Sequence, residues 1–518
     1  MTYRLGVDVG GTNTDAVLTD ENKDVIAEAK LPTTRDVQSG ISAAVEMALK
    51  TPCIDRRQVK RAMLGTTQCT NAIIERRNLA EIGILRIGAP ATLSVPPMVD
   101  WAGDLRRIAL EIEIIGGGFE HDGKEIAPFD ETAARAFFKR CAAKGLRSVA
   151  ISCAFSTVRD DHELEAARLC REIMGAGVNV SISSKIGSMG LIERENATIL
   201  NAALCGVSRG FTDGFVRSLT AEGVTDAEVY FSQNDGTLMN LETALLYPVL
   251  TIACGPTNSI RGASYLSHKA DAIVIDVGGT TTDVGFLQRG FPRESGVAVT
   301  IGGVRTNFRM PDVISFGLGG GSIVRETENG GVSIGPDSVG YEITDKALTF
   351  GGNVLTATDI AVRLGMADIG DKSLVAGIPA ELAEKAKSRM IEMVEERIDA
   401  MKVSNDDVDV VLVGGGSILL PDRLAGARSL LRPGHFAVAN AIGSVISKVS
   451  GTYEKLISYD ETPREQALEA ARKEAAEMAV RSGAIRDTVE IIDVEDVPLQ
   501  YYAGNTSRVK IKAAGDLS

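Results

Sequence analysis

The chain has 518 residues, which is long enough for at least two domains that each bury a core of their own. Hydrophobic residues make up 44% of the sequence and charged residues 24%, values that exclude a mainly disordered or fibrous protein. The formal net charge of −14 gives the chain no general attraction for nucleic acids or anionic membranes, so we expect neither as a partner.

The cysteine pattern and the hydropathy indicate a cytoplasmic protein. The seven cysteines are widely spread and form no CxxC pair, so neither a disulfide framework nor a zinc ribbon is indicated. The first ten residues lack the charged and then apolar layout of a secretory signal. No apolar run approaches the roughly 20 residues that a membrane span needs. We therefore expect reduced thiols in the cytoplasm.

The first element of the chain is a motif that occurs twice. Asp8-Val-Gly-Gly-Thr-Asn-Thr-Asp15 returns as Asp276-Val-Gly-Gly-Thr-Thr-Thr-Asp283, with seven of eight positions identical. Each copy lies between two short β-prone runs, so the sequence predicts a strand, a glycine turn and a second strand in both places. The strands are expected at residues 3–7 and 16–18, and again at 272–275 and 284–287.

The residue types in these turns suit an anionic ligand. Paired glycines allow backbone N–H groups to approach an anion, threonine hydroxyls add donors, and an aspartate at each edge can hold a metal ion. Ordinary hairpin turns are the alternative, but two copies that both keep the aspartates favour phosphate binding. The candidate residues are Gly10, Gly11, Thr12, Asn13 and Thr14 in the first turn and Gly278, Gly279, Thr280 and Thr281 in the second.

Two elements are predicted between the copies. Residues 131–143 and 161–174 read as helices around a strand at 148–153, which indicates an α/β unit inserted at about 105–180. Residues 191–204 show helical spacing and place Arg194, Thr198 and Asn201 on one face. A solvated helix face is the plain interpretation of that pattern.

Two glycine-rich loops and a tail complete the chain. Gly317-Leu-Gly-Gly-Gly-Ser322 predicts either a backbone that approaches a ligand closely or a flexible turn. Residues 408–413 form a β-prone run that ends in Gly414, Gly415, Gly416 and Ser417, which predicts a strand and a glycine loop. A helix over 465–482 and strands over 488–492 and 509–511 predict a small α/β tail.

Two glycine hairpins followed by a late strand and glycine loop resemble the phosphate and adenosine loops of the actin, sugar-kinase and seventy-kilodalton chaperone superfamily. The resemblance implies an α/β fold with two actin-like (ribonuclease H-like) halves around a nucleotide cleft. It also implies ATP and Mg²⁺ as ligands, with adenosine beside residues 414–417. The expected catalytic and metal-holding carboxylates are Asp8, Asp276 and Asp283.

Further motifs stand in order between residues 65 and 443: Gly65-Thr-Thr-Gln-Cys-Thr-Asn71, Glu193-Arg194, Ser232-Gln-Asn-Asp-Gly236, Gly255-Pro256 and Ala439-Asn-Ala-Ile-Gly443. Together they resemble the hydantoinase A/5-oxoprolinase family, which includes ATP-using subunits of acetone and acetophenone carboxylases. The resemblance makes five residues candidates for the substrate cleft: Thr66, Thr67, Asn71, Arg194 and Asn201. Thr66 or Thr67 can also cap a helix that runs to Arg77.

The resemblance also suggests how the chain is divided. We expect a first actin-like half over residues 1–262 that carries the inserted unit, with the family's N-terminal region at about 3–180. A second half is expected over 263–450, with the family's core region at about 195–450, and a C-terminal α/β tail over 451–518.

The resemblance implies ATP-dependent hydrolysis of a cyclic amide such as a hydantoin or a lactam. Transfer of the γ-phosphoryl group to the amide oxygen would create a leaving group and weaken the resonance that protects the amide. A separate hydrolase subunit is a further implied partner, and we expect an oligomer. Two alternatives remain open: the ATP-using subunit of a ketone carboxylase, and a non-enzymatic ATP-driven switch of the actin or chaperone type.

Overall fold

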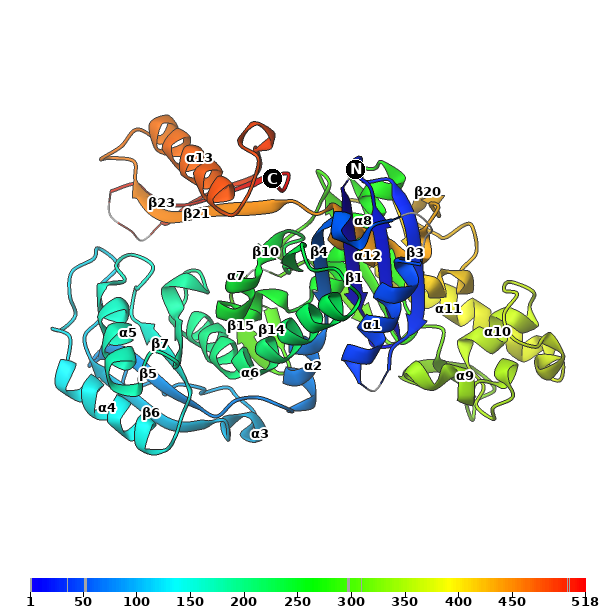
Figure 1. The fold of residues 1–518 in the computed structure, drawn as a ribbon, viewed down its shortest axis with the longest axis horizontal. Coiled ribbons are helices and arrows are strands. Elements are labelled where there is room, and N and C mark those ends of the chain that lie inside the picture. The colour runs from blue at the N-terminus through cyan, green and yellow to red at the C-terminus, as the bar shows by residue number, and fades with distance from the viewer. Residues whose placement is uncertain are drawn as a thin grey trace.

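The computed structural model describes residues 2–34, 36–50, 54–295, 299–308, 310–500, 502 and 504–518. Two β-sheets with their helices form two halves that lie side by side, and an inserted α/β unit and a C-terminal unit extend from the first of them (Figure 1). The expected α/β class is confirmed. In the described part of the chain, no helix combines the length and the hydropathy that crossing a membrane requires.

The first half is built on a nine-stranded sheet in the order β22-β23-β21-β10-β9-β4-β1-β2-β3. At its centre β1 pairs with β2 in antiparallel fashion and with β4 in parallel, and its apolar side chains Leu5, Val7 and Val9 are buried. The strands are β1 (Tyr3–Val9), β2 (Asn13–Thr19), β3 (Val25–Pro32), β4 (Val59–Thr66), β9 (Glu228–Ser232), β10 (Leu238–Asn240), β21 (Val449–Ser458), β22 (Glu490–Pro498) and β23 (Thr506–Gly515).

The second half repeats the central pairing of the first. Its sheet has the order β13-β12-β11-β19-β20, with β16 on the outer side of β12. The strands are β11 (Ala272–Val277), β12 (Thr282–Gln288), β13 (Phe291–Pro292), β16 (Val313–Phe316), β19 (Val408–Val413) and β20 (Ala427–Leu431). Strand β11 pairs antiparallel with β12 and parallel with β19. Both predicted strand, turn, strand hairpins are therefore confirmed, as is the late strand at 408–413.

Helices cover these sheets and fill the space between the halves. In the first half, α1 (Val37–Ala48) and α12 (Ala439–Ile446) both pack on β1, while α8 (Cys254–Ser267) packs on α12. In the second half, a hairpin and three helices stand beyond the sheet: β17 (Ser322–Glu326), β18 (Val332–Ser338), α9 (Ile343–Lys346), α10 (Ala357–Arg363) and α11 (Ala380–Met401). The short hairpin β14 (Val299–Ile301) and β15 (Val304–Thr306) belongs with the first half, because β15 packs on α6 (Leu191–Ala221).

The inserted unit is a separate four-stranded parallel sheet in the order β6-β5-β7-β8. Its elements are β5 (Ile82–Ala89), α3 (Gly103–Arg106), β6 (Ala109–Gly116), α4 (Glu131–Ala143), β7 (Ser148–Cys153), α5 (Asp161–Met174) and β8 (Asn179–Ile182). The predicted helices and strand are confirmed, but the expected start near residue 105 is wrong. The unit begins with β5, whose pairing to both β6 and β7 makes it a central strand.

Helix α6 connects the inserted unit to the first half. It is 31 residues long, and the predicted helical spacing at 191–204 is confirmed. The face that carries Arg194, Thr198 and Asn201 is buried and is not the solvated face that the pattern suggested. This burial follows from packing, since α6 lies against β7, α1 and α2 (Gln68–Glu75).

A fully buried ion pair fixes the inserted unit to α6. Arg86 on β5 is 0% exposed and Glu195 on α6 is 1% exposed. The Arg86 Nε donates to Glu195 Oε2 at 2.7 Å, and Ser152 Oγ donates to the same oxygen at 2.7 Å. Beside this pair, Trp101 Nε1 donates to Asn196 Oδ1 at 2.8 Å.

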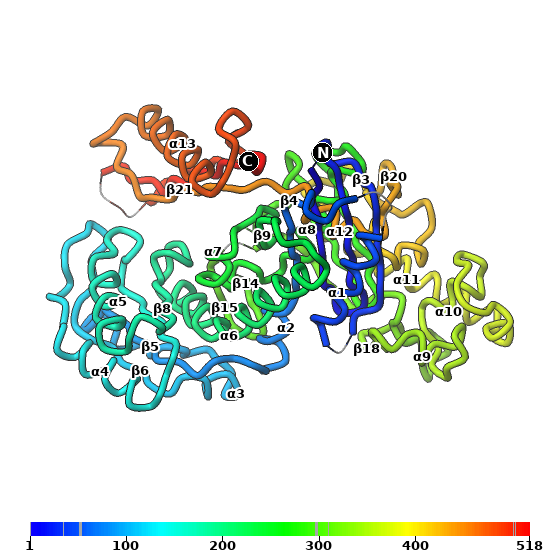
Figure 2. The backbone as a smooth tube through the Cα atoms, viewed as in Figure 1, coloured from blue at the N-terminus to red at the C-terminus, as the bar shows by residue number. Residues whose placement is uncertain are grey.

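The C-terminal residues add strands to the first half rather than forming a sheet of their own. Strand β21 pairs with β10 through Val449 and Leu238, and β23 and β22 follow on its other side. Helix α13 (Arg464–Arg481) packs on β21 and β23 (Figure 2). The predicted tail helix is confirmed, while both strands are longer than the sequence pattern suggested.

Two glycines allow α8 and α12 to pack with their backbones in contact. A Cβ atom at Gly262 would lie 1.8 Å from Ala439 O, and one at Gly443 would lie 1.8 Å from Asn258 O. The Gly443→Ala substitution is therefore expected to lower the free energy of unfolding by about 1–3 kcal/mol, measured by urea denaturation.

Gly206→Ala is the matched control for this prediction, because Gly206 is an exposed residue in the middle of α6 with no atom near its absent Cβ. It should raise stability by about 0.5–1 kcal/mol, since alanine has the higher helix propensity. Equal effects of the two substitutions would contradict the close packing of α8 and α12.

Candidate active-site cleft

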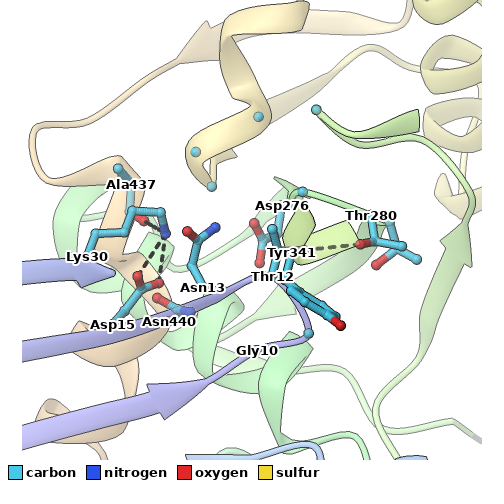
Figure 3. A pocket seen from close by; sticks show the side chains of 18 of the residues that line it. Gly10, Thr12, Asn13, Asp15, Lys30, Asp276, Thr280, Tyr341, Ala437 and Asn440 are labelled. Atoms are coloured by element: carbon cyan, nitrogen blue, oxygen red, sulfur yellow. Dashed lines mark hydrogen bonds and ion pairs between the residues drawn. The ribbon is translucent and has the colours of Figure 1, made fainter. Parts of the chain in front are cut away.

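The two repeated motifs form hairpin turns that meet at their tips. Gly10 N donates to Asn13 O at 3.0 Å in the first turn, and Gly278 N donates to Thr281 O at 2.9 Å in the second. The hydroxyls of Thr12 and Thr280 lie 3.1 Å apart and share a hydrogen bond (Figure 3). Residues that are 268 positions apart in sequence thus come together between the two halves.

A cleft of about 640 Å³ opens beside these turns. Fourteen of the sixteen residues predicted for phosphate, adenosine or metal line it: Asp8, Gly10, Gly11, Thr12, Asn13, Asp276, Gly278, Gly279, Thr280, Thr281 and Asp283, with the loop residues Gly414, Gly415 and Gly416.

 The other two, Thr14 and Ser417, are buried behind the cleft, where Thr14 Oγ1 shares a hydrogen bond with Thr33 Oγ1 at 3.3 Å.

The third loop requires glycine because it approaches the second hairpin so closely. Gly414 has a φ of 84°, and a Cβ atom there would lie 2.1 Å from Asp276 Oδ1. A Cβ atom at Gly416 would lie 2.5 Å from Gly278 O. The backbone of this loop therefore forms one wall of the cleft next to Asp276.

The glycine-rich segment at 317–322 supports the second hairpin. Gly320 N donates to Gly278 O at 3.1 Å, and Gly321 N donates to Gly279 O at 2.7 Å. Gly320 also lines the cleft. These contacts fix the segment against the second hairpin and disagree with a flexible turn. Its close approach to a ligand stays a prediction.

Three carboxyl groups face the cleft, of which Asp8 is buried and Asp276 and Asp283 are partly buried. Asp8 accepts hydrogen bonds from the side-chain amides of Asn258 and Asn440, both at 3.0 Å, and burial raises its pKa to about 7. Burial likewise raises the pKa of Asp283 to about 7, although Ser315 donates to it. Asp276 accepts from Ser259, and burial raises its pKa as well. Carboxylates at one cleft repel one another, and a bound cation would stabilise their ionised forms.

The carboxyl groups fit a Mg²⁺ ion that takes most of its ligands from water and phosphate. Among the described residues, no three histidine, cysteine or acidic side chains come close enough to hold a metal ion jointly. Mg²⁺ commonly binds one or two carboxylates, several waters and the phosphates of its nucleotide. Asp8, Asp276 and Asp283 on the walls of the cleft can supply those carboxylates.

The two copies of the motif differ in the environment of their last aspartate. In the first copy, Lys30 Nζ lies 2.9 Å from both carboxylate oxygens of the buried Asp15 and 2.9 Å from Ala437 O (Figure 3). In the second copy, Asp283 accepts from the neutral Ser315. Lys30 therefore neutralises the first-copy aspartate and connects strand β3 to the segment that precedes α12.

The Lys30→Met substitution is expected to lower the free energy of unfolding by about 1–3 kcal/mol, because it leaves the buried Asp15 carboxylate without its partner. Urea denaturation measures the loss. Lys60→Met is the control, since the pair of Lys60 with Asp226 is exposed and such pairs contribute at most about 1 kcal/mol. Equal losses in the two variants would show that Lys30 is an ordinary surface lysine.

The five substrate candidates separate into two groups. Thr67 and Asn71 line the cleft, and the buried Thr66 lies directly behind them. Thr67 is the residue before α2, but its side chain makes no capping hydrogen bond. Arg194 and Asn201 do not line the cleft.

The side chains of Arg194 and Asn201 are used in packing α6, which corrects the expectation that they line a substrate site. Arg194 donates to Ser183 Oγ at 3.0 Å and to Cys153 O at 2.7 Å. Asn201 Nδ2 donates to Ser181 Oγ and to Leu246 O, both at 2.9 Å. The common spacing of these residues therefore reflects burial against neighbouring elements.

Several residues of the cleft were not predicted. Gly255, Pro256 and Asn440 lie within the family-like motifs, but those motifs predicted no site role for them. No local sequence pattern marked Lys30 as a residue of the cleft, because its partners Asp15 and Ala437 are 15 and 407 positions away. An apolar part of the wall also went unpredicted and consists of Tyr341, Ile343, Phe350, Ile369 and Ile418.

Comparison with known proteins identifies related sequences. The chain is 26% identical to the caprolactamase subunit alpha of Pseudomonas jessenii over 411 residues, covering 72% of this chain and 56% of the relative. It is 26% identical to the acetophenone carboxylase gamma subunit of Aromatoleum aromaticum over 395 residues, covering 70% and 53%. The 5-oxoprolinase of Saccharomyces cerevisiae is 29% identical over 241 residues, covering 46% and 18%. The chain thus spans about half the length of the first two relatives.

Solved structures agree with the fold. The ATP-dependent caprolactamase from Pseudomonas jessenii superposes with a TM-score of 0.78 at 21% identity, covering 99% of this chain and 88% of that one. A nucleotide-free acetone carboxylase superposes with a TM-score of 0.69 at 17% identity, with the same two coverages of 99% and 88%. The expected α/β fold with two halves around a cleft is confirmed.

Family profiles provide the last comparison. The profile of the hydantoinase/oxoprolinase N-terminal region matches residues 4–174, and the hydantoinase/oxoprolinase profile matches residues 194–371. These two segments include the first hairpin, the inserted unit as far as α5, the part of α6 from Arg194 onward and the second hairpin. The chain belongs to the hydantoinase/oxoprolinase family.

Proposed function

We propose that the chain uses Mg-ATP to phosphorylate the carbonyl oxygen of a cyclic amide, so that the ring can be opened by water. The observation that carries the proposal is the meeting of the two glycine hairpins at Thr12 and Thr280, beside one buried and two partly buried carboxyl groups. Caprolactamase and 5-oxoprolinase, two relatives whose names refer to cyclic amides, support the choice of substrate class.

The parts of the cleft suit the parts of the nucleotide. The glycine and threonine residues of the two turns offer backbone and hydroxyl donors for phosphate oxygens. The loop at Gly414–416 and the apolar wall around Tyr341 and Phe350 offer a surface for the purine base. Mg²⁺ held through Asp8, Asp276 or Asp283 would neutralise charge on the β- and γ-phosphates.

The proposed reaction has a simple balance. The amide oxygen forms a bond to the γ-phosphorus while the bond from that phosphorus to the β-phosphate oxygen breaks, and ADP leaves. The amide nitrogen releases its proton, and water then attacks the activated carbon. The carbon–nitrogen bond breaks, and the nitrogen takes up protons and leaves as an amine, which gives an acyl phosphate. A second water attacks the same carbon, the carbon–oxygen bond to phosphate breaks, and phosphate leaves with the former amide oxygen. One lactam, one ATP and two waters give one amino acid, ADP and phosphate.

The residues of this chain contribute mainly positioning and electrostatics. Phosphoryl transfer needs the acceptor oxygen, the γ-phosphate and the leaving oxygen in line more than it needs covalent help. Thr67 and Asn71 line the cleft on the first half, where they can orient an acceptor amide. Water attack belongs either to this chain or to a separate hydrolase subunit, and two of the relatives are named as subunits.

The proposal is tested by steady-state ADP release from Mg-ATP by the purified chain, with hydantoin, 2-pyrrolidone, ε-caprolactam and 5-oxoproline. We expect at least one cyclic amide to raise turnover at least tenfold. With that amide labelled with ¹⁸O at its carbonyl, the label should appear in inorganic phosphate when ring opening is complete.

Other outcomes would favour the alternatives. Stimulation by a ketone together with bicarbonate, and by no cyclic amide, would favour a carboxylase subunit. Slow ATP turnover that no small molecule changes would favour an ATP-driven switch. Label that stays in the ring-opened product would contradict this sequence of steps, in which the amide oxygen leaves with phosphate, even where ADP release is stimulated.

A further inference from the structure

We infer that the acceptor is an uncharged cyclic amide, and that the cleft excludes acceptors that carry a carboxylate. This inference rests on the proposed function, because it concerns the acceptor of that reaction. It distinguishes neutral lactams and hydantoins from 5-oxoproline, which is the same kind of ring with an added negative charge. Three features of the cleft carry it.

The first feature is the balance of charge on the cleft walls. Of the described residues that line the cleft, four are aspartates, Asp8, Asp15, Asp276 and Asp283, and one is a lysine, Lys30. That set includes no arginine and no histidine. A cleft lined by charges of one sign focuses its field on whatever enters. A carboxylate that approaches these aspartates and the phosphates of the nucleotide is therefore repelled.

The second feature is that the lysine is already engaged. Lys30 Nζ donates to Asp15 Oδ1, Asp15 Oδ2 and Ala437 O, all at 2.9 Å. An ammonium group has three protons, so these three acceptors use its donors. Its charge is matched by that of Asp15, which is buried. Lys30 would have to abandon a buried partner before it could bind an acceptor carboxylate.

The third feature is the neutral wall that the first half presents to the acceptor. We call Thr67, Asn71, Gly255 and Pro256 the first-half wall, since all four line the cleft from the beginnings of α2 and α8. The residues are contiguous, because a Cβ atom at Gly255 would lie 3.6 Å from the Thr67 methyl group. Thr67 Oγ1 lies 3.4 Å from Val9 O, next to the first hairpin.

Backbone donors of residues next to the first-half wall are also used within the protein. Gln68 N donates to Thr66 Oγ1 at 3.3 Å, and Ala253 N donates to Thr70 Oγ1 at 3.2 Å. Pro256 has no N–H group. Asn71 Nδ2 donates to Thr67 Oγ1 at 3.4 Å. The second proton of that amide and its Oδ1 are a donor and an acceptor, which match the C=O and N–H of a neutral cyclic amide.

The experiment compares matched pairs of ligands on the full chain. Lactams of five to seven ring atoms are each assayed beside the same ring with a carboxylate next to the nitrogen, so that 2-pyrrolidone is paired with 5-oxoproline. The carboxamide of 5-oxoproline controls for size, because it keeps the added group without the charge. The readout is kcat/KM for stimulated ADP release.

We expect kcat/KM for the neutral member to exceed that for the carboxylate by at least tenfold in every pair that is active, and the carboxamide to behave like the neutral ring. A carboxylate within tenfold of its neutral partner would overturn the inference while the proposed function stands. A carboxamide as poor as the carboxylate would overturn it too, since size would then explain the difference. If no cyclic amide of either kind stimulates turnover, the proposed function fails and the inference fails with it.

A charge-gain variant tests the assignment to the first-half wall. Asn71→Lys adds a cation there, and Asn71→Gln changes the side chain without adding charge. We expect Asn71→Lys to reduce the preference for the neutral member at least tenfold relative to Asn71→Gln. An unchanged preference would show that the acceptor charge is not sensed at this wall, which would overturn that part of the inference.

Discussion

Asp276→Asn is expected to lower ATP turnover by at least a hundredfold while the chain remains folded. Asp276 is partly buried near the end of β11, accepts a hydrogen bond from Ser259 and lies against the glycine loop at Gly414. The asparagine side chain keeps the shape and removes the charge that the proposed function requires for Mg²⁺. Loss of one such electrostatic contact at a reacting centre typically costs 10²–10³ in rate. Steady-state ADP release at saturating Mg-ATP measures the effect.

Asp312→Asn is the control for this variant. Asp312 is paired with Arg293 at the surface of the second half and does not line the cleft. Its substitution should leave turnover within about twofold, in keeping with the small effects of surface pairs. Circular dichroism checks that both variants are folded. A folded Asp276→Asn protein that retains more than a tenth of the turnover would exclude the metal-holding role of this residue.

Arg86→Met is expected to have the largest effect on stability, a loss of about 3–5 kcal/mol, because it leaves the Glu195 carboxylate buried without a counterion. The sequence contains one tryptophan, and Trp101 is bonded to Asn196 beside this ion pair. Tryptophan fluorescence during urea denaturation therefore reports on the contact between the inserted unit and α6.

The double variant Arg86→Met with Glu195→Leu is the control. It removes both charges, and replacing a buried ion pair by apolar side chains is often close to neutral. We expect it to regain at least half of the stability that Arg86→Met loses. A double variant as unstable as the single one would show that the loss comes from side-chain packing and not from the uncompensated charge.

The elements that the sequence predicted well depend on local patterns. The two hairpins and the loop at 414–416 were predictable because glycine clusters between β-prone runs specify a turn within a few residues. The inserted helices were predictable for the same reason, since their apolar spacing is local.

The errors arise where distant segments decide the outcome. Strand β5 was missed because its central place depends on pairing with β7, more than 50 residues later. Arg194 and Asn201 share a helix face, but only the position of neighbouring elements determines whether that face meets solvent, a ligand or protein. The contacts of Lys30 could not be predicted without the folded positions of Asp15 and Ala437.

The joining of β21 to β10 has a consequence for biosynthesis. Strand β10 is made early, yet its neighbour on one side begins at residue 449. While the ribosome is still producing the second half, the open edge of β10 can pair with another nascent chain, as unpaired edge strands commonly do. A polypeptide that stops before residue 449 is therefore expected to aggregate, and the last seventy residues protect the earlier sheet as soon as they emerge.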